Sequence, residues 1–146
     1  MYFDSHAHYD DERFDDDRNE LLASFPDEGI ENVVNSSSNV ASSKASVALA
    51  EKYPFFYASV GVHPHEVEKM TEQDLLELET LSKHEKVVAI GEIGLDFYYD
   101  LSPRDMQRYW FKRQLELAER LDMPIIVHSR DAAQECFDII KASGVR

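Results

Sequence analysis

Two histidines near the start of the chain have the spacing of a metal-binding pair. His6 and His8 lie two residues apart in a segment expected to be extended, and side chains at that spacing on a strand point to the same face. Asp4 is in phase with both of them. Imidazoles paired on one face at a strand end are a geometry that divalent transition metals accept. The alternative is that both are ordinary surface or core histidines, so the assignment depends on further ligands elsewhere in the chain.

Other candidate ligands lie at the carboxyl ends of apolar stretches. They are His63, His65, Glu92 and His128. In α/β folds with parallel strands the active site lies at the carboxyl edge of the sheet, whether the sheet is open or closed into a barrel. One glutamate or one histidine in such a place is weak evidence. Their agreement in position favours a metal site over scattered histidines.

Five apolar stretches alternate with five helical ones along the chain. After the strand that carries the first histidine pair, the expected strands are 30–35, 55–62, 87–96 and 124–128. The expected helices follow each of them, the second over 40–52, the third capped by Thr71 and the fourth ending near Leu121. Near-continuous apolar strands are typical of a parallel sheet covered by helices. Because the glycine-rich turn of a dinucleotide fold is absent after the first strand, a barrel of the (β/α) TIM type is favoured over an open sheet.

Two local predictions concern the last two helices. Ser102 and Pro103 form a helix start, with a capping hydroxyl and a proline at the first helical position. In the last helix, Cys136 and Phe137 belong to a set at helical spacing that is expected to face the core.

The composition restricts the functional classes. A chain of 146 residues with 43% hydrophobic content is sufficient for one domain with a core. Its 15 basic and 29 acidic residues give a net charge of −14, which argues against a broad basic surface that tracks a nucleic-acid backbone. An enzyme that meets phosphates through bound cations is not excluded. The single cysteine, the absence of an apolar run long enough for a membrane and the absence of a leader predict a cytoplasmic protein without membrane contact.

Four motifs together resemble a known family. They are Asp4-Ser5-His6-Ala7-His8, Gly61-Val62-His63-Pro64-His65, Gly91-Glu92-Ile93-Gly94-Leu95-Asp96 and Val127-His128-Ser129-Arg130. In this order and spacing they resemble the TatD family of metal-dependent deoxyribonucleases, from Met1 to the last residue. The resemblance implies a (β/α)₈ barrel that binds two divalent metal ions (Zn, Mn or Mg). It also implies that His6 and His8 hold one ion, that Glu92 bridges both, and that His128 holds the second.

The resemblance further implies DNA as the substrate, as single strands or ends. His63 and Arg130 would lie near the substrate phosphate and act in catalysis with Glu92, while His65 and Asp96 would also lie on the substrate side. Asp96 would orient a ligand or a water. Two cations about 3.5–4 Å apart suit phosphodiester hydrolysis, because they neutralise phosphate charge and clamp the attacking and leaving oxygens.

The length differs from that of a complete barrel. Eight strand–helix units need roughly 250 residues, and the family takes a further histidine and an aspartate from later strands. We therefore expect residues 1–146 to form a single metal-dependent hydrolase domain that is C-terminally incomplete, with about five of the eight units. Its open sheet edges are templates for self-association or for a complementary piece. Two alternatives remain: another barrel amidohydrolase acting on amide or lactone bonds, which usually bridges its metals with a modified lysine, and an inactive truncated module that binds a metal or a partner.

Overall fold

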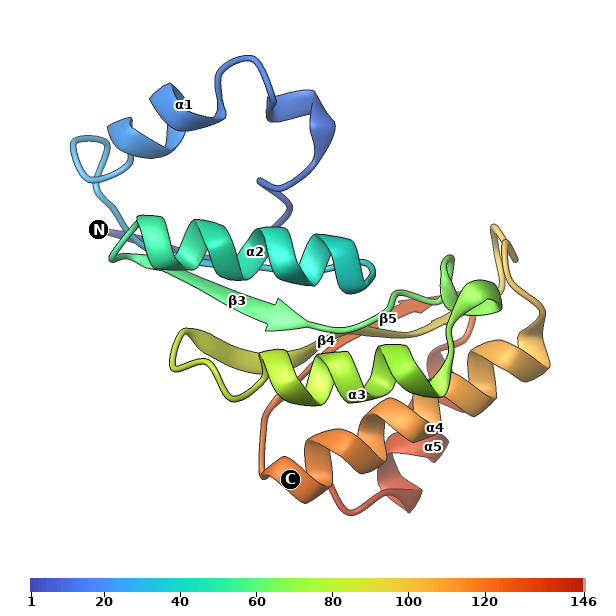
Figure 1. Cartoon of the computed structure of the whole chain (residues 1–146). Helices are drawn as coiled ribbons and strands as arrows, with labels where there is room; N and C mark the ends of the chain where they lie inside the picture. Colours follow the sequence, from blue (N-terminus) through green and yellow to red (C-terminus); the bar gives the residue numbers. More distant parts are fainter. Residues whose placement is uncertain (146) are drawn as a thin grey trace.

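A computed structural model describes residues 1–145, which form one parallel sheet and the helices that connect its strands (Figure 1). The strands are β1 (Tyr2–Ala7), β2 (Ile30–Asn35), β3 (Phe56–Val60), β4 (Val87–Asp96) and β5 (Ile125–Arg130). The helices are α1 (Arg18–Ser24), α2 (Val40–Lys52), α3 (Glu72–Leu81), α4 (Arg104–Leu121) and α5 (Ala133–Ala142), with short 3₁₀ turns at Glu12–Phe14 and Val67–Lys69.

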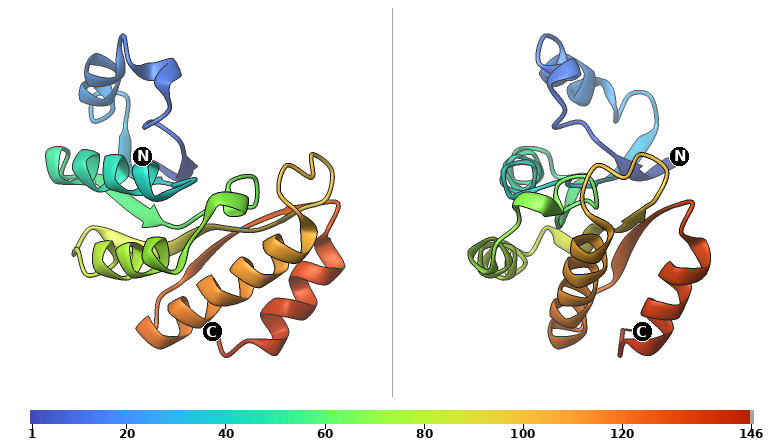
Figure 2. Two further views of the ribbon diagram at one scale, coloured as in Figure 1. Left: turned by 45° about the vertical axis from the view of Figure 1, so that its right-hand side comes forward. Right: turned by 90° about the vertical axis from the view of Figure 1, so that its right-hand side faces the viewer.

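The strands lie in the sheet in the order in which they occur in the sequence, and each neighbouring pair is parallel. Helices α2, α3, α4 and α5 follow one another in an arc around the outside of the curled sheet (Figure 2). This is the predicted barrel-type arrangement with five strand–helix units. Within residues 1–145, β1 and β5 each have a strand on one side only, and the pairing of a second chain along these edges stays a prediction.

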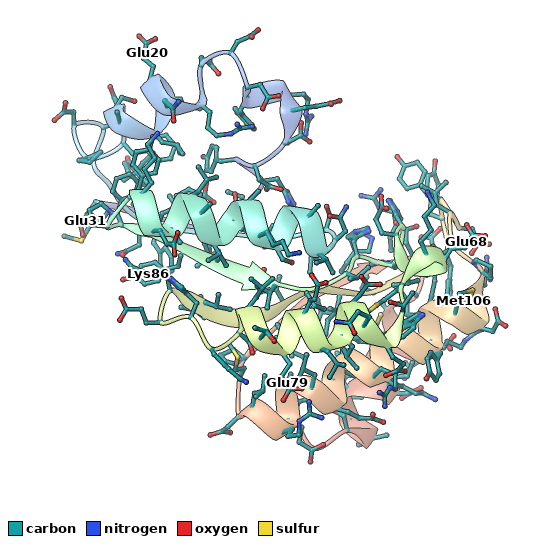
Figure 3. The ribbon with its side chains drawn as sticks, viewed as in Figure 1. Glu20, Glu31, Glu68, Glu79, Lys86 and Met106 are labelled. Carbon is teal, nitrogen blue, oxygen red and sulfur yellow. The ribbon has the colours of Figure 1, made fainter. Side chains whose placement is uncertain are left out.

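The most deeply buried strand is the one that carries the central carboxylates. Every residue of β4 except Val88 is buried, as expected for a strand with neighbours on both sides and helices over one face. The edge strand β1 differs, because Tyr2 and Phe3 are 69% and 63% exposed. Figure 3 labels Glu31 and Lys86 at the amino ends of the sheet and Glu68 at the opposite end, where the candidate ligands lie.

Two buried glutamines on α4 hold the carboxyl ends of β3 and β4 in place. The side-chain amide of Gln107 accepts the backbone N–H of Asp96 at 2.9 Å and donates to the carbonyl oxygens of Asp96 and Ser102 at 3.2 and 2.8 Å. About two turns further along, Gln114 accepts the N–H of Val62 at 2.8 Å and donates to its carbonyl at 3.0 Å. Buried backbone groups need such partners, so α4 sets where the chain leaves each strand.

The predicted helix start at residue 102 is wrong in detail. Pro103 is the N-cap residue of α4, and no side chain caps the helix. The buried hydroxyl of Ser102 instead donates to the carbonyl of His65 at 3.0 Å and accepts the backbone N–H of Glu68 at 3.2 Å. The hydroxyl therefore joins two loops, a contact that only the tertiary fold creates.

The expected core position of Phe137 is also wrong, since its side chain is 58% exposed, whereas Cys136 is buried as predicted. Helix α5 is the last helix of the arc and has a helix neighbour on one side only (Figure 2), so its buried stripe is narrow. The predicted cap at Thr71 is confirmed, and it forms a capping box with Asp74. No helix within residues 1–145 is both long and apolar enough to cross a bilayer.

Candidate metal centre

Five histidines and two carboxylates gather at the carboxyl ends of the strands. They are His6 on β1 and His8 just after it, His63 and His65 after β3, Glu92 and Asp96 on β4, and His128 on β5. All of them except Asp96 line an open cleft of about 1030 Å³. The parallel topology alone accounts for the gathering, because it brings every strand end to one rim.

The first group of ligand atoms comes from β1 and β4. The Nε2 atoms of His6 and His8 lie 3.1 and 3.6 Å from Oε2 of Glu92. The Nδ1 atom of His8 donates to the carbonyl oxygen of Ser36 at 2.7 Å, which leaves its Nε2 unprotonated in the neutral ring. Two atoms bound tetrahedrally to one zinc ion at about 2.0–2.1 Å lie about 3.3 Å apart. These three side chains therefore fit one divalent cation.

Glu92 also faces the opposite side of the cleft. Its second oxygen, Oε1, lies 3.1 Å from Nδ1 of His128, while Oε2 faces the β1 histidines. A carboxylate whose two oxygens face different histidines has the geometry of a bridging ligand.

The buried carboxylate of Asp96 orients His65 and His128 through hydrogen bonds. Its Oδ2 atom accepts Nε2–H of His65 at 2.7 Å and Nε2–H of His128 at 2.9 Å, and its Oδ1 atom accepts the backbone N–H groups of Tyr98 and Tyr99. With its side chain fully buried, this carboxylate lies beneath the cleft. His128 donates Nε2–H to Asp96, so Nδ1, which faces Glu92, is the nitrogen that a cation could bind in place of a proton, as in a metal-ligating histidine held by a carboxylate.

A glycine sets the position of His128. Gly94 and His128 are register partners in β4 and β5, and a Cβ atom on Gly94 would lie 1.9 Å from the carbonyl oxygen of His128. The φ angle of Gly94 is +147°, which L-residues with a side chain rarely adopt. Only glycine permits β5 to approach this closely.

His63 and His65 form a second potential ligand group with His128, since one nitrogen from each lies within 4.8 Å of the others. The hydrogen bonds weigh against a metal there. Nδ1 of His63 accepts the backbone N–H of His65 at 3.1 Å, so the proton of the neutral ring is on Nε2. His63 is thereby a hydrogen-bond donor at the cleft.

The two carboxylates at the site are ionised at pH 7, as a cation site requires. Burial opposes ionisation of Glu92, but its hydrogen bond with His128 and the nearby His63 and His6 lower its pKa to about 2. Burial also opposes ionisation of Asp96, whose pKa is nevertheless lowered by the N–H of Tyr99 and by its histidine partners. The pKa of His128 is raised, chiefly by its hydrogen bond with Glu92. Burial, with a contribution from His128, lowers the pKa of His63 to about 3, so that ring is neutral at pH 7.

Two other predicted positions lie outside this cluster. Asp4 accepts the hydroxyl of Tyr9 at 3.1 Å and the backbone N–H of His6 at 3.3 Å, so it holds the loop after β1 and faces none of the metal-ligand nitrogens. Arg130 lines the cleft with its guanidinium over the ring of Tyr99, at 5.0 Å from the centroid. Among residues 1–145 this guanidinium has no ion-pair partner.

A buried polar network behind the site was not anticipated. The side chain of Asn35 donates to Asp10 at 2.7 Å and to Ser46 at 2.8 Å, and it accepts the backbone N–H of Tyr9 at 2.6 Å. It ties the loop that follows His8 to the end of β2. Nothing in the sequence distinguishes this asparagine from an ordinary strand end.

The chain is similar to known proteins along nearly its whole length. Residues 3–146 match the family described as TatD related DNase. The chain is 41% identical over 144 residues to the "Uncharacterized metal-dependent hydrolase YabD" of Bacillus subtilis, a match that covers 99% of this chain and 56% of that protein. It is 35% identical over 131 residues to the "3'-5' ssDNA/RNA exonuclease TatD" of a Pantoea species, covering 89% of this chain and 50% of that protein.

Among solved structures, the TatD homologue YjjV from Escherichia coli superposes with a TM-score of 0.87 at 32% identity, over 96% of this chain and 55% of that one. This likeness confirms the predicted fold class. The chain spans about half the length of the curated relatives it matches.

Proposed function

The chain belongs to the TatD-related DNase family, and from this premise we propose that it acts as a divalent-metal-dependent phosphodiester hydrolase. The proposed activity is that of a deoxyribonuclease of exonuclease type that acts on single strands or ends. The observation that supports this proposal best is the position of Glu92. One of its oxygens faces a histidine on the edge strand β1, and the other faces a histidine on the opposite edge strand, β5. Relatives named as exonucleases of single-stranded DNA and RNA support the substrate class.

In this proposal His6 and His8 hold one cation, His128 holds a second, and Glu92 bridges the two. Imidazole nitrogens suit zinc, and the carboxylate suits manganese or magnesium as well. The chemistry that such ions supply when bound is neutralisation of phosphate charge and acidification of a water molecule.

The remaining polar groups of the cleft act on the substrate. Arg130 supplies a positive charge for a phosphate oxygen. His63 is neutral at pH 7 and presents Nε2–H as a hydrogen-bond donor to the same group. Asp96 and His65 orient rather than react, since their hydrogen bonds hold each other and His128 in place.

We also propose that residues 1–146 act as a single hydrolase domain that supplies only part of the ligands of the second ion. Glu92 and His128 offer the second ion one carboxylate oxygen and one nitrogen, fewer than the three protein ligands of a catalytic zinc site. Further ligands would then have to come from polypeptide outside this stretch.

The test combines metal titration with digestion of a labelled single-stranded oligonucleotide in the presence of manganese or zinc. Glu92→Gln keeps the shape of the side chain and removes its charge, and we expect it to abolish cleavage and to weaken metal binding at least tenfold. Glu31→Gln is the matched control, because it makes the same change at the opposite end of the sheet (Figure 3).

Each other outcome selects against the proposal. Cleavage at the unsubstituted rate by Glu92→Gln would overturn it. Stoichiometric metal binding without cleavage favours a metal-binding module, and hydrolysis of amides or lactones in place of DNA favours an amidohydrolase.

A further inference from the structure

Two neighbouring tyrosines on the loop between β4 and α4 have exposed side chains. Tyr98 and Tyr99 are 64% and 52% exposed, with ring centroids 4.9 Å apart and ring planes nearly perpendicular. The loop extends beyond the carboxyl ends of the strands (Figure 1). Large aromatic side chains left in water beside a functional cleft often mark a binding surface.

The tyrosine pair is tied to the metal centre through its backbone. The N–H groups of both residues donate to Oδ1 of Asp96, at 3.1 and 2.8 Å, and the other oxygen of Asp96 holds His65 and His128. One buried carboxylate therefore sets the distance between the tyrosines and the candidate metal ligands.

Other side chains stabilise the loop, and the tyrosine rings stay largely exposed although the Tyr99 ring contacts the His65 ring edge-on, at 5.6 Å between centroids. Arg104 donates to the carbonyl of Phe97 at 3.2 Å and binds Asp100 at 2.9 Å. The guanidinium groups of Arg104 and Arg108 lie over the ring of Phe97, at 4.5 and 5.1 Å from its centroid. Since Phe97 and the arginines hold the loop, stability alone does not require two exposed rings.

The side chain of Arg130 adds a positive charge to the tyrosine surface. Asp96 and Arg130 are register partners in β4 and β5, and the Arg130 guanidinium lies 5.0 Å from the centroid of Tyr99. The chain as a whole carries a charge of −14, so an arginine over the ring of Tyr99 at this cleft is a local exception to the charge of the protein. Aromatic faces bind bases, and guanidinium groups bind phosphates and also stack on bases.

We propose that Tyr98, Tyr99 and Arg130 form a nucleobase subsite, in which an unpaired base of the substrate stacks on the tyrosine surface while Arg130 contacts the adjoining phosphate. The proposal rests on the proposed function and adds a reason for a single-stranded substrate. A paired base in a duplex offers no free face to these rings, whereas an unpaired base does.

The test measures binding without hydrolysis, by fluorescence anisotropy of a labelled thymidine 12-mer with phosphorothioate linkages. Tyr98→Ala is expected to weaken binding about 5- to 150-fold, the range for loss of one stacked base, and Tyr98→Phe is expected to bind within about twofold of the unsubstituted chain. Tyr109→Ala is the matched control, because Tyr109 is 50% exposed on α4 and outside the cleft.

A strand of the same length without bases separates stacking from charge. Tyr98→Ala and the unsubstituted chain should bind this abasic strand equally. Arg130→Gln should weaken the binding of both strands and reduce the slope of log affinity against log salt by about 0.7, the value for one phosphate contact on a single strand.

Equal binding of the thymidine strand by Tyr98→Ala, or an equal loss on the abasic strand, overturns the subsite. Hydrolysis of bis(p-nitrophenyl) phosphate, which has no nucleobase, reports on the proposed function separately. If the unsubstituted chain hydrolyses this ester in a Glu92-dependent manner while Tyr98→Ala binds DNA normally, the subsite fails and the hydrolase stands. If the ester is not hydrolysed but Tyr98→Ala weakens binding of the thymidine strand, the subsite stands and the hydrolase fails.

Discussion

Replacing Asp96 with asparagine tests whether a buried carboxylate controls the metal-ligand nitrogen of His128. In the native chain Oδ2 of Asp96 accepts hydrogen bonds from Nε2–H of both His65 and His128. The substitution retains Oδ1, which accepts the N–H groups of the following loop, and puts an NH₂ donor opposite two other donors. His128 must then rotate or move its proton to Nδ1, the atom that faces Glu92.

The magnitude follows from the bonds that are lost. Each hydrogen bond between an imidazole and an ionised carboxylate contributes roughly 1.5–3 kcal/mol, and only the bond to His128 acts on a proposed metal ligand. Loss of such a supporting partner typically lowers metal affinity by about 10–100-fold. We therefore expect Asp96→Asn to weaken one of two binding steps by that factor and to leave the step at His6 and His8 within about threefold.

The assay is competition calorimetry with zinc and a chelator of known affinity at pH 7.5, with circular dichroism to verify folding. Asp100→Asn is the matched control, because it makes the same change four residues further along at an exposed side chain that pairs with Arg104. Asn also tolerates the positive φ of 53° at this position. Equal zinc affinity in both variants, with a folded chain, would refute the role assigned to Asp96.

Two further predictions concern stability without metal. Gly94→Ala should destabilise the chain by more than about 3 kcal/mol, because a Cβ atom would overlap the carbonyl of His128. Gly29→Ala has φ of +78° and meets only the backbone nitrogen of Met1, at an ordinary 3.6 Å, so it should cost about 1 kcal/mol. Urea denaturation measures both, and similar losses would contradict the close approach of β5. His63 has a folded-state pKa of about 3, below the unfolded value of about 6.5, so the unfolded state binds more protons and stability falls as the pH decreases through 6.5. Between pH 7.5 and 5.5 in chelator the unsubstituted chain should lose about 1 kcal/mol more than His63→Gln, and parallel losses would show that the ring is not held neutral.

Much of the fold follows from local sequence signals. The bounds of β2 and β4 agree with the predicted strands 30–35 and 87–96. Gly29 precedes the first of these strands, and the second is a nearly continuous apolar run that begins after Lys86. The predictions for Ser102 and Phe137 failed for one reason. Both outcomes depend on tertiary surroundings. Ser102 bonds to a segment distant in sequence, and Phe137 is exposed on a helix that has a helix neighbour on one side only within residues 1–145, so helix periodicity and capping rules could not identify either outcome.

The candidate site also contains residues whose positions could be predicted from the sequence and residues whose positions could not. The gathering of His6, His8, Glu92 and His128 could be predicted, since parallel strands place their carboxyl ends at one rim. Two features could not be predicted: the position of Asp96 beneath the cleft, and the hydrogen bonds from the side chain of Gln107 to the backbone of Asp96. They depend on the path of a loop and on how a helix packs against it. The metal and substrate roles of these residues stay predictions.

The most direct measurement is anomalous diffraction at the zinc edge from crystals soaked in zinc. We expect a peak within about 2.0–2.2 Å of Nε2 of His6, Nε2 of His8 and Oε2 of Glu92. We expect a second peak between Oε1 of Glu92 and Nδ1 of His128. Zinc bound elsewhere, with no peak beside Glu92 at saturating concentration, would contradict this expectation.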